Sequence, residues 1–195
     1  SFIIKLAKKI YGIKGKNYKK KGIVVWYSQE MLDDIHKYIP TLIHKPSIYT
    51  RVPDVIINNL KLAKVFIKGY FSCDGGIILT INKNGYLRRE ISLESHNPYL
   101  FDDICKILRK LQINFKAHKE YQYISILSKD SLIKFKKKIG LLPVKIKGNR
   151  WKNFRKDRLL NLIVITYSEN FKKRFRSYDE LKRDLIRFIE QSKER

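Results

Sequence analysis

Two parts of this sequence follow the same pattern at a spacing of 100 residues, and this spacing constrains the fold more than any other feature. Ser28 and Ser128 each precede an amphipathic segment, and Leu32 and Leu132 occupy the same place within it. Further apolar residues recur at the same spacing, namely Ile4 and Ile104, Ile13 and Ile113, Val24 and Ile124, and Ile39 and Ile139. A repeat of this length predicts two units that fold alike.

Residues 61–140 contain a complete unit. Apolar residues recur at helical spacing in its first, middle and last parts, and two pairs of strand patterns separate these helices. The pair Asn84-Gly85 is typical of a hairpin turn within the first strand pair, and Gly140 ends the last helix. The order is therefore helix, strand, strand, helix, strand, strand, helix (αββαββα), which predicts a mixed α/β fold of the α+β kind with antiparallel sheets.

The same comparison divides the chain into four parts. Residues 1–40 match only the second half of the unit, with Ser28 as the N-cap of the last helix. Residues 41–60 hold prolines and little periodicity, so they are predicted to be an ordered connector. The complete unit at 61–140 follows, and residues 141–195 form a basic segment with a C-terminal helix.

The stretch from Leu62 to Gly76 begins as an apolar helix and ends at an acid that two glycines follow. Gly69 and Cys73 are four residues apart, so they lie on one face of the helix and form a groove that a second helix could approach closely. A glycine inside a helix costs roughly 1 kcal/mol relative to alanine, which indicates that close packing matters there. Asp74 is predicted to leave the end of that packed helix.

A carboxylate at such a helix end is a suitable ligand for Mg²⁺, and a bound metal can activate water. One carboxylate alone provides few ligands for a metal, however. The sequence Asp-Gly-Gly by itself is more often a simple turn. The spacing of 100 residues places the counterpart of Asp74 before Ser1. The partner helix is therefore expected from a second copy of the chain or from a separate N-terminal fragment.

The charge of the chain points to a polyanionic partner. The sequence has 43 lysines and arginines against 18 aspartates and glutamates, for a net charge of +25 at pH 7. Neutralising phosphates with such cations releases counterions, which favours nucleic acid over the weaker alternative of an anionic membrane.

No apolar run approaches the ~20 residues of a membrane span and no signal peptide is present, so a cytoplasmic, nucleoid-associated protein is expected. Cys73 and Cys105 lack the spacing of a zinc site.

The motif and the repeat together resemble the LAGLIDADG homing endonucleases and the endonuclease domains of inteins. Residues 67–75 lie over the nine signature letters, and Gly69, Asp74 and Gly75 are identical to them. Ser72 stands at the first acidic letter, a departure that the family tolerates. The resemblance covers most of the chain, although the first motif helix is missing from it.

This resemblance implies a site-specific, Mg²⁺-dependent DNA endonuclease of the homing type, either free-standing or encoded by an intron or intein. In that family two signature helices pack at a pseudo-two-fold axis, and their final acids hold divalent metal that hydrolyses both DNA strands. Asp74 then matches the catalytic, metal-binding acid, with Gly75 beside it in the metal site. The residues implied at the helix interface are Gly69, Cys73, Ile67 and Tyr70. Curved antiparallel sheets are implied to form a saddle over the major groove of double-stranded DNA.

Alternation along the strands predicts which side chains face that DNA. Arg88 shares a face with Glu90, whereas Arg89 points to the opposite side. In the next strand Lys116 faces DNA and Ala117 points to the core. The full set of residues predicted to face DNA is Lys14, Lys16, Arg88, Lys116, Tyr121, Tyr123, Lys145, Lys147 and Arg150. For any one of them, a merely solvated basic face is the alternative.

A second class of function competes with the endonuclease. Relatives of this fold serve as DNA-binding transcription regulators or as RNA maturases, and the missing first motif favours such a non-cleaving binder with DNA or RNA as its partner. Dimerisation through the face of Gly69 and Cys73 would instead restore the pair of acids. The endonuclease is the preferred interpretation.

Overall fold

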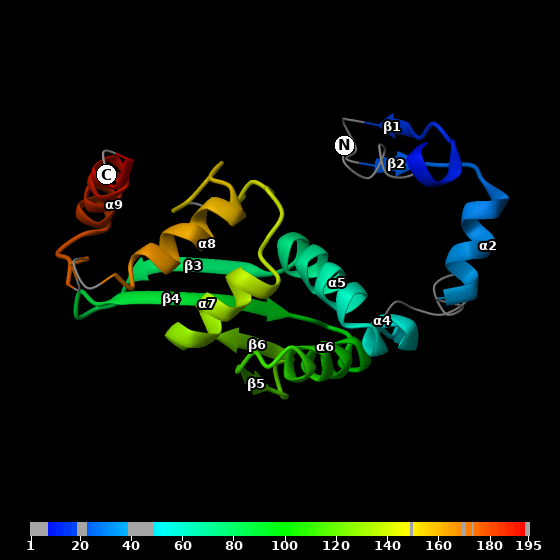
Figure 1. The fold of residues 1–195 in the computed structure, drawn as a ribbon, viewed down its shortest axis with the longest axis horizontal. Coiled ribbons are helices and arrows are strands. Elements are labelled where there is room, and N and C mark those ends of the chain that lie inside the picture. The colour runs from blue at the N-terminus through cyan, green and yellow to red at the C-terminus, as the bar shows by residue number, and fades with distance from the viewer. Residues whose placement is uncertain are drawn as a thin grey trace.

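A four-stranded antiparallel sheet with helices on one face forms the centre of the molecule (Figure 1). The computed structural model describes residues 8–18, 23–38, 49–148, 150–168, 171–172 and 174–193. The sheet has the order β3-β4-β6-β5, with the strands β3 (Gly76–Ile81), β4 (Leu87–Glu94), β6 (Tyr123–Ile126) and β5 (Lys116–His118). A second sheet pairs β1 (Lys16–Tyr18) with β2 (Ile23–Val25).

Seven helices are bounded in the described part of the chain: α2 (Gln29–Tyr38), α4 (Asp54–Asn58), α5 (Leu60–Cys73), α6 (Pro98–Lys110), α7 (Lys129–Lys138), α8 (Lys156–Ile165) and α9 (Tyr178–Lys193). Residues 61–140 thus run α5-β3-β4-α6-β5-β6-α7, which is the order that the sequence predicts. The predicted mixed fold with an antiparallel sheet is confirmed.

Local capping explains where several of these helices begin and end. The Asn97 side chain accepts a hydrogen bond from the Leu100 N–H at 3.0 Å, ahead of the proline that opens α6. The Ser28 hydroxyl accepts from the N–H of Met31, and the Ser128 hydroxyl accepts equivalently at the start of α7. Gly140 adopts a φ of +69° just after α7, a conformation in which glycine is favoured over other residues.

The strand register repeats at the spacing found in the sequence. Lys16 pairs with Val25 in the first hairpin. Lys116 pairs with Ser125 in the second hairpin, which is the same pairing 100 residues later. Each hairpin leads to a helix with a serine cap, so the two segments share strand pairing and helix start. The division of the chain into half a repeat and a complete repeat stays a prediction, and residues 41–48 of the predicted connector lie outside the described part.

One side of the main sheet forms the core. Leu79, Ile91 and Ile124 from three adjacent strands are at most 1% exposed, and they belong to the same buried cluster as residues of helices α5 to α8. The rings of Phe71 and Phe135 join α5 to α7 with centroids 5.4 Å apart. Ala117 is exposed instead of pointing into this core, which corrects the prediction; β5 is a short edge strand that contributes no residue to the cluster.

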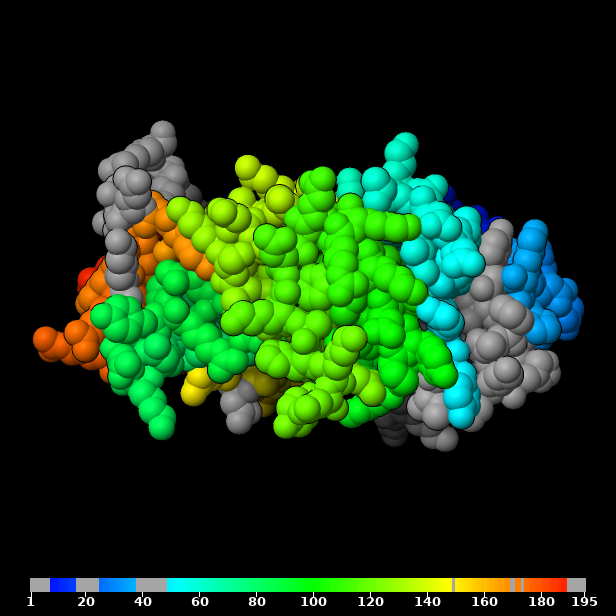
Figure 2. Space-filling model, turned by 90° about the horizontal axis from the view of Figure 1, so that it is seen from below, coloured from blue at the N-terminus to red at the C-terminus, as the bar shows by residue number. Residues whose placement is uncertain are grey.

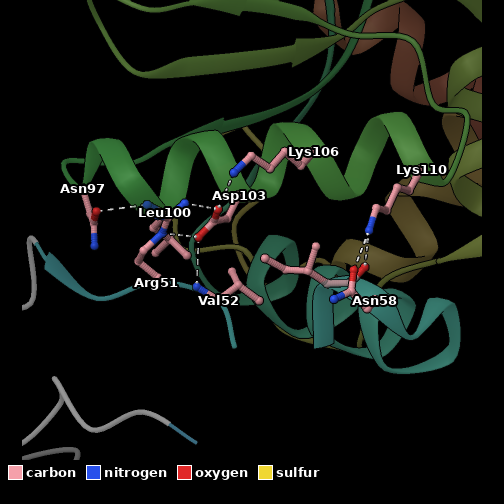
Figure 3. Close-up of polar contacts among 9 residues, drawn as sticks. Arg51, Val52, Asn58, Asn97, Leu100, Asp103, Lys106 and Lys110 are labelled. Carbon is pink, nitrogen blue, oxygen red and sulfur yellow. Dashed lines mark hydrogen bonds and ion pairs between the residues drawn. The ribbon is translucent and has the colours of Figure 1, made fainter. Parts of the chain in front are cut away.

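The chain just before α5 is fixed to α6 by polar contacts, of which the buried Asp103 carboxylate is the centre (Figure 3). Asp103 accepts hydrogen bonds from the Arg51 guanidinium at 2.8 and 3.1 Å and from the Val52 N–H at 3.2 Å. Burial raises the pKa of the Asp103 carboxyl, but the hydrogen bonds from Arg51 and Val52 outweigh burial and hold the pKa below its ordinary value. Lys110 at the other end of α6 donates to the Asn58 side chain at 2.9 Å. These contacts set the direction in which α5 leaves the connector.

The segment after α7 covers the outer edge of the sheet. The Trp151 indole donates a hydrogen bond to the carbonyl oxygen of Leu79 at 2.8 Å, which pairs a backbone group of the edge strand β3. Helices α8 and α9 both contact β3. In the part of the chain that the structure describes, no helix combines the length and the apolar character that crossing a bilayer would take.

Candidate functional site

Helix α5 ends in an exposed carboxylate. The Asn59 side chain caps the start of the helix, and at its end the Asp74 N–H donates to the Tyr70 carbonyl at 2.9 Å. A Cβ on Gly75 would lie 2.5 Å from the Phe71 carbonyl oxygen, so the chain can turn back this closely only with glycine at that position. The side chain of Asp74, the last residue before this turn, is exposed to solvent.

A buried lysine lies under the same helix end. Lys156, at the start of α8, is 8% exposed, and its ammonium donates to the carbonyl oxygens of Gly75 at 2.5 Å and Cys73 at 3.4 Å. Burial lowers the pKa of Lys156, and the charge of Asp74 opposes that effect. The lysine supplies donors to the carbonyl of the last helical residue, Cys73, and to that of Gly75 in the turn that follows, neither of which has a partner within the helix. It therefore holds the chain at the point where Asp74 leaves the helix.

The outward face of α5 is apolar and open. Leu62 is 42% exposed and Val65 is 69% exposed, and both lie away from the core. A Cβ built on Gly69 would meet no atom within 4 Å among the described residues. Cys73 is exposed further along the helix, so the groove predicted from the two small residues is present as an uncovered surface.

The other two residues implied at the helix interface lie differently. Ile67 is 0% exposed and faces the core of its own domain together with Ala63 and Phe71, the neighbours at helical spacing. Tyr70 is half-buried, and burial raises its pKa while a hydrogen bond with Ser95 lowers it. The surface available to another helix is thus made by the outward residues of α5, and Ile67 is not among them.

The second side of the main sheet is polar. The strand pairing places Arg88 opposite Thr80 and places Glu90 next along the same face. Arg88 donates to the Glu90 carboxylate at 2.6 and 3.0 Å, and this hydrogen bond raises the pKa of Arg88. The Tyr123 hydroxyl donates to the other oxygen of Glu90 from strand β6. Glu90 is only 2% exposed, and this buried carboxylate orients the exposed guanidinium of Arg88.

Arg150 reaches this face from the segment that follows α7. Its guanidinium donates to the Thr80 hydroxyl at 2.6 Å, directly across the strand pair from Arg88. Arg88, Tyr123 and Arg150 are thereby brought together on one surface, and Lys116 is exposed on the edge strand β5. The remaining residues predicted to face DNA are exposed but have no described contact with this surface: Lys14, Lys16, Tyr121, Lys145 and Lys147.

Comparison with known proteins identifies the part of the chain that holds Asp74 and Arg88. Residues 61–140 match a family model described as the LAGLIDADG-like domain. These residues form a LAGLIDADG-like domain. A stretch of 68 residues is also 35% identical to an uncharacterized protein of Methanocaldococcus jannaschii, MJ0314, and the match covers 34% of this chain. The chain spans about a quarter of the length of that relative, since the match covers 25% of it.

Ser72, at the first acidic letter of the LAGLIDADG motif, is a structural residue in this chain. It is 0% exposed, its hydroxyl donates to the Lys68 carbonyl at 2.5 Å, and it accepts the N–H of Leu142 at 2.8 Å. A carboxylate at this position would be buried next to a backbone carbonyl, which is costly for a charge. The LAGLIDADG helix of this chain therefore ends with a single acid, Asp74.

The described residues of one chain do not complete a metal site at the end of the LAGLIDADG helix. Among the described residues, no three histidine, cysteine, aspartate or glutamate side chains gather as a metal-binding group. Gly75 was predicted beside Asp74 as part of the metal site. Its carbonyl oxygen accepts a hydrogen bond from the ammonium of Lys156. One carboxylate is then left, and Mg²⁺ in proteins is usually held by one or two carboxylates together with substrate phosphates.

Lys156 is the residue of this site that the sequence did not single out. It stands in a basic run of the sequence between Lys145 and Arg158, where nothing in the spacing separates a buried lysine from solvated ones. A cation in the first turn of a helix is unfavourable, but the exposed Arg158 lies in the same turn of α8, so this position does not separate Lys156 from its neighbours. A lysine buried there needs a partner, and the end of α5 supplies that partner.

Proposed function

We propose that the protein is a site-specific DNA endonuclease of the homing type whose active site forms when two LAGLIDADG helices pack together. One observation carries the proposal: Asp74 presents an exposed carboxylate at the end of a helix whose outward face is apolar and uncovered. Packing of a second such helix on the groove of Gly69 and Cys73 would bury Val65 and bring a second acid beside Asp74. A second copy of the chain or a separate N-terminal fragment could supply that helix.

The paired acids define the proposed chemistry. Two carboxylates at adjoining helix ends form an oxygen-rich donor set for Mg²⁺, which when bound would activate water and stabilise the leaving oxygen of a phosphodiester. The contribution of this chain's own residues is positional. Lys156 fixes the turn after α5, and Gly75 allows the chain to return closely enough for Asp74 to point outward. Because the proposed substrate is DNA, the protein is proposed to act inside the cell.

The polar face of the main sheet is the proposed DNA-binding surface. Arg88 and Arg150 lie on adjacent positions of this face, held by Glu90 and Thr80. Arginines fixed in this way can contact phosphates or the edges of guanine bases. Lys116 extends the cationic surface to the edge of the sheet, and the net charge of +25 favours association with duplex DNA.

Substitution of Asp74 by asparagine tests the proposal. The chain is incubated with Mg²⁺ and plasmids that carry candidate intron or intein insertion sites, and linear product is measured. We expect Asp74→Asn to abolish cleavage while duplex binding survives. Asp102→Asn is the matched control, because Asp102 is an exposed aspartate on a different helix, α6. Cleavage by Asp74→Asn at the rate of the control would refute the assignment.

A non-cleaving binder is the second candidate function. The observation that favours it is the occupied Gly75 carbonyl, which leaves one free carboxylate in the chain's own site. A regulator of transcription or an RNA maturase would retain the basic sheet face without catalysis. A chain that is monomeric in solution, binds duplex DNA or intron RNA and leaves every plasmid intact would support this candidate.

A further inference from the structure

The segment between α8 and α9 is attached to the tip of the β3–β4 hairpin. Arg174 forms an antiparallel bridge with Tyr86, and the Phe175 N–H donates to the Gly85 carbonyl at 2.9 Å. The Arg174 side chain donates to the Asn84 carbonyl at 3.1 Å and lies over the Tyr86 ring. Figures 1 and 2 show this segment, coloured orange, beside the hairpin at one end of the molecule.

The hairpin turn has a shape that suits this attachment. Gly85 has a φ of +81°, and a Cβ at that position would lie 2.5 Å from the Phe175 carbonyl oxygen. Phe175 itself is 2% exposed, and its ring lies 5.9 Å from the ring of Phe171, which is also buried. The attached segment is therefore anchored by apolar side chains as well as by backbone hydrogen bonds.

A pocket of about 660 Å³ opens between the turn and the attached segment. Its lining consists of Ile81, Asn82, Lys83, Asn84, Gly85, Lys172, Arg174, Phe175 and Arg176, so four cations and no carboxylate line it. Glu180 lies outside this lining, where its carboxylate pairs with Lys172, accepts a hydrogen bond from the Arg176 N–H at 2.5 Å and interacts with the Arg176 charge. Over the ranges that the structure describes, Lys83, Arg174 and Arg176 form no ion pair, and all three are exposed.

We propose that this hairpin-tip pocket binds phosphates of the duplex DNA backbone and extends the DNA contact beyond the polar face of the sheet. The inference rests on the proposed function as a DNA-binding endonuclease. Lys83 and Arg174, together with Arg176, which Glu180 compensates in part, form a site for oxyanions beside a polar turn, since Arg and Lys are the usual protein donors to phosphate oxygens. The antiparallel bridge places Arg174 opposite Tyr86, and Tyr86 lies two residues before Arg88, so Arg174 is on the same side of the sheet as Arg88 and the pocket continues this face outward.

A double variant of Lys83 and Arg176 tests the pocket without undocking the segment. Arg174 is left unchanged because it makes the contacts with Asn84 and Tyr86. Lys83→Ala/Arg176→Ala is compared with Lys134→Ala/Lys137→Ala, which removes the same charge from α7, on the helix-covered side of the sheet. The affinity of each full-length protein for a random 40-base-pair duplex is measured from 50 to 200 mM NaCl, and thermal unfolding verifies that each is folded.

The expected result is a smaller salt dependence for the pocket variant only. Each phosphate that is no longer neutralised lowers the magnitude of the slope of log K against log[salt] by about 0.9, so two such phosphates lower it by about 1.8. A slope equal to that of the α7 control overturns the pocket proposal and leaves the proposed function intact. Wild-type protein that shows no salt-dependent duplex binding overturns both. Loss of affinity for inorganic pyrophosphate with unchanged duplex binding also overturns the proposal, because the pocket would then serve a small anion.

Discussion

The side-chain ammonium of Lys156 lies 2.5 Å from the carbonyl oxygen of Gly75, at the end of the LAGLIDADG helix. The lysine is buried, and it also reaches the carbonyl of Cys73. These two backbone groups bracket Asp74 in the chain. One cation from α8 thus joins the C-terminal part of the protein to the turn that presents the candidate catalytic acid.

Replacement of Lys156 by methionine is expected to destabilise the protein. The methionine side chain has similar length but donates no hydrogen bond, so the buried Gly75 carbonyl loses its partner at a cost of about 1–3 kcal/mol. The measurement is the free energy of unfolding from urea titration. Under the proposed function, cleavage should also fall, because the turn that carries Asp74 is no longer fixed.

Lys152→Met is the control for this substitution. Lys152 is exposed four residues earlier in the same segment, and exposed substitutions away from special contacts usually change stability by less than about 0.5 kcal/mol. Equal stability of the two variants would show that the buried hydrogen bond contributes nothing measurable.

The ion pair of Asp103 with Arg51 predicts a pH dependence of stability. The pKa of Asp103 in the folded protein lies below its ordinary value of 3.8, because hydrogen bonds from Arg51 and Val52 outweigh the effect of burial. The folded state therefore holds the proton less tightly than the unfolded chain. The stabilisation is fully present above the ordinary carboxylate range and is lost as the pH falls through the lowered pKa of the folded state.

Asp103→Asn should lower the free energy of unfolding by about 1.5–3 kcal/mol at pH 7, the range for hydrogen bonds to a charged group. The difference from wild type should shrink as the pH is lowered below 4, since wild type then loses the same contribution. Urea titrations across this pH range measure it. Asp102→Asn, the exposed neighbour, should show a much smaller difference, because its charge makes only a minor contribution at Arg51. A wild-type to Asp103→Asn difference that is constant with pH would contradict the prediction.

Val65→Glu tests the helix pairing on which the proposed endonuclease depends. Val65 is 69% exposed on the open face of α5, so the chain should fold with glutamate there. Two helices packed on this face would bury the new charges, which is strongly unfavourable without partners. Sedimentation should show loss of self-association, and plasmid cleavage should disappear with it.

Ile186→Glu provides the matched control, because Ile186 is 56% exposed on α9 and far from this face in the chain. Its self-association and cleavage should equal those of wild type. If both variants associate and cleave as wild type does, pairing through the open face of α5 is excluded.

Periodicity and spacing predicted most of the domain. The alternation of residues in β4 located Arg88 and Glu90 on one face and Arg89 on the other, as the strand pairing shows. The repeat predicted the serine caps, because a hydroxyl before an amphipathic run is a local signal. The order of helices and strands followed from these local patterns, which do not depend on distant contacts.

Contacts between distant segments were beyond such reasoning. Lys156 and Gly75 are 81 residues apart, and no local pattern distinguishes this lysine from its solvated neighbours. Ile67 was assigned to the helix interface from its place in the motif, yet helical spacing relative to Ala63 and Phe71 puts it in the core. Helical spacing alone separates the buried face of α5, with Ala63, Ile67 and Phe71, from its open face.

The two cysteines offer a direct probe of the open face of α5. Cys73 is exposed beside the groove of Gly69, whereas Cys105 is buried and burial raises its pKa to about 11. The thiolate is the reactive form, so an alkylating reagent at pH 8 should modify Cys73 rapidly and leave Cys105 unmodified in the folded protein. Mass spectrometry should then show one added group per chain in the Val65→Glu variant, in which pairing is disrupted.

Pairing of α5 with a second helix should slow the modification of Cys73 by covering it. In wild-type protein the rate of alkylation should fall as the protein concentration rises through the range in which self-association occurs. The Ile186→Glu control should show the same protection, and Cys73 in Val65→Glu should react at a rate that is independent of concentration. A rate in wild type that never varies with concentration, in samples that sediment as dimers, would place the dimer interface elsewhere on the molecule.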